Sequence, residues 1–299
     1  MMNKVNDVNR LIFGSLAVIC GLVVPGLAQA ESAAEVAARL GLPESAVKSL
    51  SFAATFDRGF EADFARGDAR LYSSKTLDRK VVDATLEAEE VVTVTGGVGP
   101  GRMLQFRPGR KNFLFYKVKE NLAYQAKGSW SGTISYWLKL DPEQDLPKEF
   151  VDPLQITQKA WNDAAFWNDF TKDDRPRKFR LGVLADLKVW NPDNRDFDKM
   201  PDTEKPAVVL HKPPFSREKW TNITISFSNY NTGEKNGRAR LYLDGQLQGE
   251  VSGRDQRYSW DAEKAAILIG INYVGAFDNL LIFDRELSDG EIKQISAVK

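Results

Sequence analysis

The chain has 299 residues, of which 42% are hydrophobic and 11% aromatic, and this is enough to build a substantial buried core. Its 41 Lys and Arg residues balance 41 Asp and Glu residues. The balance argues against nucleic-acid binding, which needs a basic surface, and it gives no support for attraction to anionic lipid.

The first 30 residues have the organisation of a secretory signal peptide. Lys4 and Arg10 supply positive charge, residues 11–24 form an apolar stretch, and Ala28-Gln29-Ala30 is a cleavage motif with small residues at both ends. The apolar stretch is shorter than the roughly 20 residues that a membrane-spanning helix needs. We therefore predict cleavage and no membrane span after it, with a retained anchor as the alternative.

The only cysteine, Cys20, lies inside this signal, and Ile19 before it is too bulky for a lipoprotein signal. Cleavage would leave a mature chain without disulfides, thiol nucleophiles or thiolate metal sites. An exported chain without cysteine fits a bacterial periplasm or exterior better than a eukaryotic secretory route. We therefore expect an extracytoplasmic bacterial protein, secreted or periplasmic.

Residues 31–49 are predicted to form a short helical segment that packs on the main domain or extends from it. Ser32-Ala33-Ala34-Glu35 is a capping box, in which the Ser and Glu side chains bond each other's backbone N–H groups. Gly41 ends this first helix, and Pro43-Glu44 opens another turn.

From residue 50 onward, short stretches of strand character follow one another. Some alternate apolar and polar residues, which is typical of strands with one buried face, and others are continuous apolar runs typical of central strands. The alternating stretches are 134–140, 222–228 and 238–243, and the continuous runs are 265–270 and 275–283. Because sustained helical periodicity is missing between residues 50 and 285, we predict an all-β fold, an antiparallel β-sandwich over residues 50–299.

Two polar stretches punctuated by prolines, 141–176 and 191–206, are predicted to be long loops inserted between strands. At the other end of the chain, Ser288-Asp289-Gly290-Glu291 is a second capping box, which predicts a short closing helix.

Three segments follow one another in a characteristic order: GSWSGTISYWL at 128–138, the stretch from Trp220 to the RLYLDG motif ending at 245, and GAFDNLLIFDRELS at 275–288. Together they resemble the laminin-G-like jelly roll of the concanavalin A-like lectin and glucanase superfamily. The similarity covers about residues 50–296 and implies two stacked antiparallel sheets. Members of this superfamily bind glycans or proteins, or stack as accessory domains, and some hold a structural calcium ion.

Catalysis has little support in the sequence. A retaining glucanase places two carboxylates across the bond that it cleaves, and the expected Glu-x-Asp-x-x-Glu strand motif does not occur. The acidic residues Asp163, Asp169, Asp173 and Asp174 are scattered over an expected loop, and His211 is the only histidine. A single histidine without cysteines cannot build an ordinary zinc site. No catalytic residue is therefore predicted, and an enzyme is less favoured than a binding protein.

Carbohydrate binding is the leading functional hypothesis, because sugar rings stack on aromatic faces while neighbouring polar groups bond their hydroxyls. The candidate ligand-binding residues are Trp161, Trp167, Asn168, Trp190 and Tyr230. The alternative is that these aromatic side chains are core material, since large aromatic residues are buried on average.

A structural calcium ion is a second hypothesis, with Asp57 and Asp278 as its candidate ligands. Asp278 shares a strand face with apolar residues, and a carboxylate there is costly unless it is paired or bound to metal. The alternative is that Asp278 accepts backbone hydrogen bonds.

Together these patterns predict a secreted binding module without catalysis that recognises a polysaccharide or another glycoconjugate, such as a cell-surface glycan. The first alternative is a protein-interaction or envelope-structural domain that contacts another extracytoplasmic protein. The second alternative is a glycosidase or lyase that acts on polysaccharide.

Overall fold

The computed structural model describes residues 30–80, 82–83 and 91–298 of the chain. Residues 1–29, which hold nearly all of the predicted signal peptide, lie outside the described residues. In the part that the structure describes, no helix is both long enough and apolar enough to cross a membrane.

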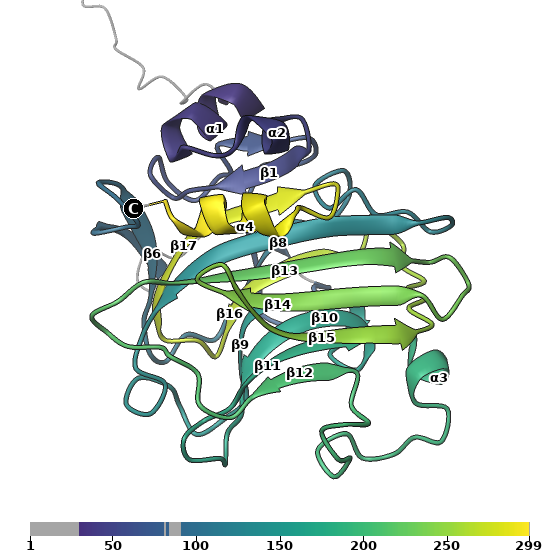
Figure 1. Cartoon of the computed structure of the whole chain (residues 1–299). Helices are drawn as coiled ribbons and strands as arrows, with labels where there is room; N and C mark the ends of the chain where they lie inside the picture. Colours follow the sequence, from purple (N-terminus) through teal and green to yellow (C-terminus); the bar gives the residue numbers. More distant parts are fainter. Residues whose placement is uncertain (1–29, 81, 84–90, 299) are drawn as a thin grey trace, which may run out of the picture.

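Two antiparallel sheets pack face to face and form a β-sandwich (Figure 1). The first sheet has the order β15-β14-β13-β8-β17-β1-β2, with β6 also paired to β17 and β5 to β6. Its strands are β1 (Leu50–Ala54), β2 (Phe64–Ala65), β5 (Val91–Thr95), β6 (Arg102–Phe106), β8 (Trp130–Lys139), β13 (Thr221–Tyr230), β14 (Gly237–Leu243), β15 (Gln246–Arg254) and β17 (Gly275–Phe283). The predicted all-β sandwich is confirmed.

The second sheet has the order β12-β11-β10-β9-β16-β7-β3-β4. Its strands are β3 (Tyr72–Ser74), β4 (Val82–Asp83), β7 (Phe113–Lys117), β9 (Val151–Ala160), β10 (Asp163–Phe170), β11 (Phe179–Leu184), β12 (Ala207–Leu210) and β16 (Ala266–Ile271). Strands β9 to β12 follow one another along the chain and in the sheet, so this half is a simple meander.

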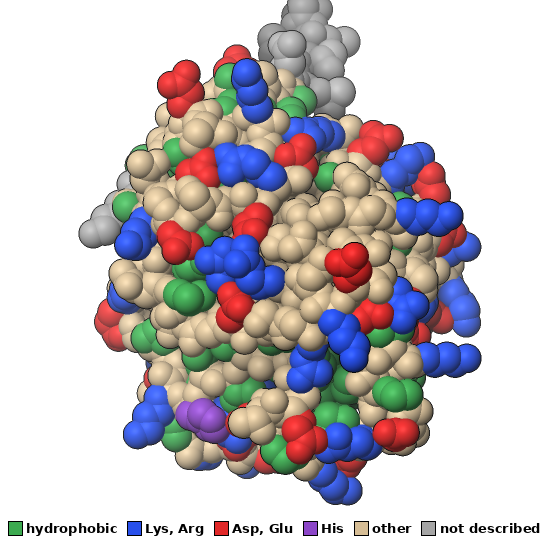
Figure 2. Space-filling model, turned by 45° about the vertical axis from the view of Figure 1, so that its right-hand side comes forward, with side chains coloured by type: hydrophobic (Ala, Val, Ile, Leu, Met, Phe, Trp, Pro, Cys, Tyr) green, Lys and Arg blue, Asp and Glu red, His purple; other side chains and the backbone are tan. Residues whose placement is uncertain are grey.

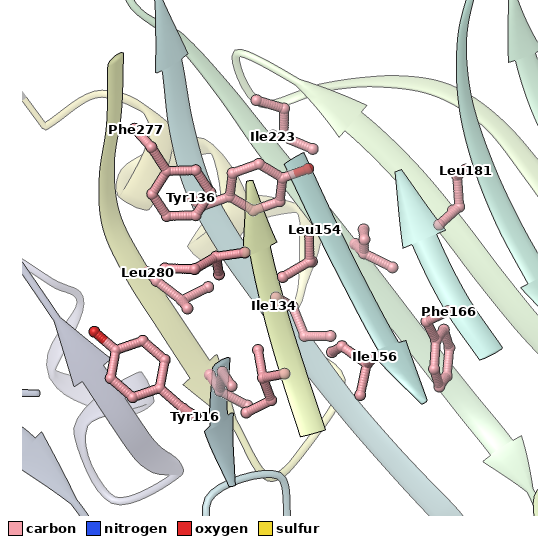
Figure 3. Close-up of a cluster of buried hydrophobic side chains, with 14 of the residues drawn as sticks. Tyr116, Ile134, Tyr136, Leu154, Ile156, Phe166, Leu181, Ile223, Phe277 and Leu280 are labelled. Atoms are coloured by element: carbon pink, nitrogen blue, oxygen red, sulfur yellow. The ribbon is translucent and has the colours of Figure 1, made fainter. Parts of the chain in front are cut away.

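The core lies between the two sheets, where alternate residues of the central strands point inward (Figure 3). Tyr136 on β8 stacks on Phe277 of β17, with ring centroids 5.1 Å apart. At the other end of the core, Trp130 packs edge-on against Phe227 at 4.9 Å and Trp260 at 5.3 Å. Aromatic side chains of this size supply much of the apolar area that stabilises a chain without disulfides.

Helices α1 (Ala33–Leu40), α2 (Glu44–Val47) and α4 (Asp289–Ser296) lie together at one end of the molecule (Figure 1). Ser32 and Ser288 cap α1 and α4, each in a capping box as the sequence predicts. The apolar faces of these helices and the outer face of strands β1 and β17 form a second, smaller cluster, which includes Val36, Leu281 and Ile292.

The expectation of a long loop over 141–176 is wrong for residues 151–170, which form β9 and β10. The stretch has an irregular pattern because polar residues such as Gln155, Asn168 and Asp169 lie inside these strands, and both faces of the strands are covered. Residues 191–206 contain no helix or strand and follow the short helix α3 (Leu187–Trp190).

Candidate ligand-binding site

A cavity of about 290 Å³ lies on the outer face of the second sheet, the face turned away from the core. Its floor comes from β9, β10 and β11, and part of its wall comes from the 191–206 segment. Its lining residues are Leu77, Phe150, Asp152, Gln155, Trp161, Trp167, Asp169, Arg180, Phe197, Asp198, Ile271 and Asn272. It is named the Trp161 cavity below, and its volume is near the lower end of the range for small-molecule sites.

Trp167 forms one apolar surface of this cavity and lies flat across the neighbouring strand. Its partner in the sheet register is Gly182 on β11, and a Cβ atom at Gly182 would lie 2.3 Å from the indole ring. The indole Nε1 donates a hydrogen bond to the Trp161 carbonyl at 2.9 Å. The missing side chain at Gly182 therefore allows the position of Trp167.

An ion pair between Asp169 and Arg180 lies beside Trp167. The two residues are direct cross-strand partners on β10 and β11, and they are 4% and 5% exposed. Arg180 donates from Nε to Asp169 Oδ1 at 2.8 Å and from Nη2 to Oδ2 at 2.5 Å. Burial alone would lower the pKa of Arg180, but the bonds to Asp169 raise it, so the guanidinium stays charged.

Three aromatic rings surround this guanidinium. Its central carbon lies 5.4 Å from the ring centroids of Trp167 and Phe197, and 5.6 Å from that of Phe150. Arg180 also donates from Nη1 to Asp198 at 3.2 Å. Arg180 therefore donates its hydrogen bonds to Asp169 and Asp198, and the three aromatic rings lie against its guanidinium group.

Two polar side chains on β9 have no such partners. Among the described residues, no donor bonds the partly buried carboxylate of Asp152, and the buried Nε2 of Gln155 has no acceptor. Burial raises the pKa of Asp152 well above its ordinary value, and the nearby charge of Asp169 adds to this. The raised pKa favours the protonated form of Asp152, so the cavity presents an uncharged carboxyl group and an amide donor, both without a partner among the described residues.

Trp161 lies at the β9–β10 turn and is 44% exposed, which makes it one of the few large apolar side chains on the described surface. It packs edge-on against Phe197 at 5.8 Å. Trp190 lies behind Phe197, at 6.0 Å, and donates its indole N–H to the Asn162 carbonyl. Of the predicted ligand-binding residues, Trp161 and Trp167 thus line one cavity, with Trp190 in the next layer.

Asn168 and Tyr230 do not belong to this site. Asn168 follows Trp167 directly, and because successive strand residues point to opposite faces, its side chain enters the core. There it accepts a bond from the Tyr136 hydroxyl at 2.7 Å and donates to the Arg180 carbonyl at 3.0 Å. Tyr230 is 0% exposed and stacks on Phe166 and Tyr258. For these two residues, the alternative that they are core material is correct.

Four further residues line the cavity and are not among the predicted ligand-binding residues: Asp152, Gln155, Arg180 and Phe197. A usable signal exists for part of the set: once β10 is recognised as a strand, Trp167 and Asp169 must share a face. The other side chains come from separate strands and from the 191–206 segment, so only the register of the sheet brings them together.

The predicted calcium ligands lie elsewhere, where a glycine-rich loop meets β17. Asp278 accepts hydrogen bonds from the backbone N–H groups of Asn279 at 2.8 Å and Val98 at 2.6 Å. Asp57 accepts from the Arg102 N–H at 2.7 Å and from Arg39 Nη1 at 2.6 Å. Both carboxylates therefore have partners from the protein.

No group of three or more His, Cys, Asp or Glu residues in the described ranges is arranged to hold a metal ion. The positive charge at this position comes from Arg39, which also lies 3.4 Å from Asp63. The geometry favours the hydrogen-bonding alternative for Asp278, and calcium binding stays a prediction.

The topology defines the class of protein, an antiparallel β-sandwich of the jelly-roll type. Residues 129–293 match the family described as the concanavalin A-like lectin/glucanases superfamily. Since this match covers more than half of the chain, the chain belongs to that family. The resemblance predicted from its three sequence segments is confirmed. No curated protein is detectably similar in sequence.

Solved structures with the same fold are distant in sequence. Domain 4 of AbnA, a GH43 extracellular arabinanase from Geobacillus stearothermophilus solved with arabinotriose, is 14% identical, with a TM-score of 0.50 and coverage of 83% of this chain and 98% of that chain. The binding domain of botulinum neurotoxin DC, solved with rat synaptotagmin II, is 12% identical, with a TM-score of 0.54 and coverage of 84% and 52%. This chain therefore spans about half the length of the neurotoxin chain. At such identities the likeness establishes the fold alone.

Proposed function

We propose that the protein is an exported carbohydrate-binding module and that the Trp161 cavity is its ligand site. The observation that carries the proposal is the pairing of an exposed indole at the rim with unmatched polar groups on the floor. A sugar ring could cover the apolar face of Trp161 while its hydroxyls bond Asp152 and Gln155. Small-molecule sites have this composition, mostly apolar walls with a few convergent polar groups.

Two further facts support the proposal. Basic and acidic side chains are interspersed on the face shown in Figure 2, which does not resemble a nucleic-acid surface. The similar arabinanase domain was solved with arabinotriose, so a sandwich of this fold accompanies a sugar ligand in that protein. Export rests on the predicted signal peptide, and sequencing the N-terminus of the protein recovered outside the cytoplasm tests that step.

Affinity electrophoresis through gels that contain soluble polysaccharides tests the binding function. Trp161→Ala should weaken retention by at least about tenfold, because it removes the one exposed ring at the cavity. Trp220→Ala is the matched control: Trp220 is partly buried, lies under Lys139 at 5.3 Å and is not part of the cavity. Retention of the control should be unchanged. Absence of retention on every polysaccharide, or equal retention of Trp161→Ala and the unchanged protein, would contradict the proposal.

The polysaccharide-cleaving alternative has one observation in its favour, because Asp152 and Asp169 both line the cavity. However, Asp169 is held by two bonds from Arg180, which leaves Asp152 as the one carboxylate without a cation. Glycoside hydrolysis ordinarily needs two carboxylates that can each take part. Release of reducing ends from a polysaccharide that the protein binds would favour this alternative over the binding module.

A further inference from the structure

We propose that the Trp161 cavity takes an uncharged sugar unit and discriminates against glycans that carry a carboxylate or an ammonium group at that position. This inference rests on the proposed function and deepens it, since it names the chemical class of the ligand.

The ionised groups of the cavity leave no countercharge for a charged ligand. Asp169 and Asp198 line it together with a single cation, Arg180, and both are bonded to that cation. Burial and the charge of Asp169 raise the pKa of Asp152 and so favour its uncharged form. A uronic acid placed there would have to bury its carboxylate without a cation and near Asp169, which are the conditions that oppose the ionisation of Asp152.

The unmatched groups on β9 require a ligand that both donates and accepts. The carbonyl oxygen of Asp152 can accept a bond and its hydroxyl, when protonated, can donate one, while the buried Nε2 of Gln155 needs an acceptor. An unsatisfied buried amide costs about 1–3 kcal/mol, which a ligand acceptor could recover. A sugar hydroxyl is both a donor and an acceptor, so neighbouring hydroxyls on one ring can satisfy both residues.

An ammonium group satisfies only half of this requirement. It carries donors and no acceptor, so it would leave Gln155 Nε2 unsatisfied. The faces of Trp167, Phe150 and Phe197, which could otherwise attract a cation, already lie against the Arg180 guanidinium. These three faces are therefore not free to bind a cationic ligand, and the exposed ring of Trp161 at the rim is the aromatic surface that remains.

Isothermal titration of the purified protein with soluble polysaccharides of different charge tests the proposal. The probes are dextran, galactomannan and arabinan as uncharged polymers, polygalacturonate as an anionic polymer and chitosan as a cationic one. At least one uncharged polymer should bind about tenfold or more tightly than either charged polymer. Tighter binding of polygalacturonate or chitosan, with Trp161→Ala still abolishing it, would overturn the selectivity while leaving the proposed function intact. No binding of any polymer would overturn both.

Two variants test whether the residues on the cavity floor act in ligand binding and not in folding. Gln155→Leu should weaken binding of the uncharged polymer by about fivefold or more without lowering the melting temperature, because it removes a buried donor that has no partner in the fold. Asp152→Asn should keep a preference of about tenfold or more over polygalacturonate, because the amide is uncharged, as is the protonated carboxyl group that it replaces. Asp193→Asn is the control, since Asp193 is exposed and outside the cavity. Unchanged binding of the uncharged polymer by Gln155→Leu, or a preference that falls to about threefold or less in Asp152→Asn, would overturn the assignment.

Discussion

Asp278 is a single residue that should make the stability of the fold depend on pH. It is 1% exposed, and its burial raises its pKa to about 8, although the Val98 and Asn279 N–H groups act in the opposite direction. An unfolded chain would return the group to its ordinary pKa near 3.8. The folded protein therefore binds this proton more tightly than the unfolded protein does, and the contribution to stability is lost as pH rises from about 4 to about 8.

Asp278→Asn should remove this contribution. Its amide cannot titrate, so the free energy of unfolding should fall less steeply between about pH 4 and pH 8 than it does in the unchanged protein. Urea unfolding at a series of pH values, with chelator present, measures both slopes. The variant also loses an acceptor for one backbone N–H, so its absolute stability will be lower at low pH, and the comparison therefore uses slopes. Identical slopes would show that Asp278 is ionised in the folded protein throughout this range.

The same residue separates the calcium hypothesis from the hydrogen-bonding alternative. A bound calcium ion would keep Asp278 ionised, since a metal ion favours the charged form of its ligand. The melting temperature of chelator-treated protein would then rise on adding calcium, and Asp278→Asn would lose that rise. A melting temperature that calcium does not change would remove the hypothesis.

At the scale of elements, the Asp169–Arg180 pair connects β10 to β11 under the 191–206 segment. Arg180→Ala should lower the free energy of unfolding by about 3–5 kcal/mol, because it leaves a buried carboxylate without its cation. The control is Arg195→Ala, which breaks the Arg195–Glu204 pair, whose two side chains are each 49% exposed. That change should lower the free energy of unfolding by less than about 1 kcal/mol. Urea unfolding of both variants measures the difference, and equal losses would mean that the buried pair adds nothing beyond an exposed one.

The elements that the sequence predicts well are those whose signals are local. Ser32 with Glu35 and Ser288 with Glu291 lie within one helical turn, so the capping boxes are visible without tertiary information. The sequence does not predict strands β9 and β10, because strands that are covered on both faces lose the alternation of polar and apolar residues. Polar residues at both inward and outward positions, such as Asn168 and Asp169, then look like loop sequence.

The same limit explains the candidate site. Trp161 and Trp167 were predicted because they are close in sequence and aromatic, whereas Asp152 and Arg180 join them only through strand pairing. Asn168 was wrongly included because it is a sequence neighbour of Trp167, although a strand places the two on opposite faces. Proximity along the chain therefore predicts contacts between side chains well within one helical turn and poorly across a sheet.

At the scale of the whole molecule, one core joins the two sheets, and a second cluster ties the terminal helices to the same strands. Leu280 and Ile282 on β17 point into the core, while Leu281 and Phe283 on the same strand pack against α1 and α4. Loss of the helices would expose the outer face of a central strand. The arrangement therefore couples the 31–49 segment to the sandwich.

This coupling predicts that the described part of the chain unfolds in a single cooperative transition. Trp130 and Trp260 lie in the core, so tryptophan fluorescence reports the packing of the two sheets, while far-ultraviolet circular dichroism reports the strands and helices together. The two signals should show the same urea midpoint, since cooperative loss of one core changes both. Trp161→Phe is the control, because it removes the most exposed tryptophan and should leave the fluorescence and circular dichroism midpoints equal.

A fluorescence midpoint that differs from the circular dichroism midpoint in both proteins would show that the helical segments and the sandwich unfold separately. Residues 31–49 would then be an appendage and not part of the domain.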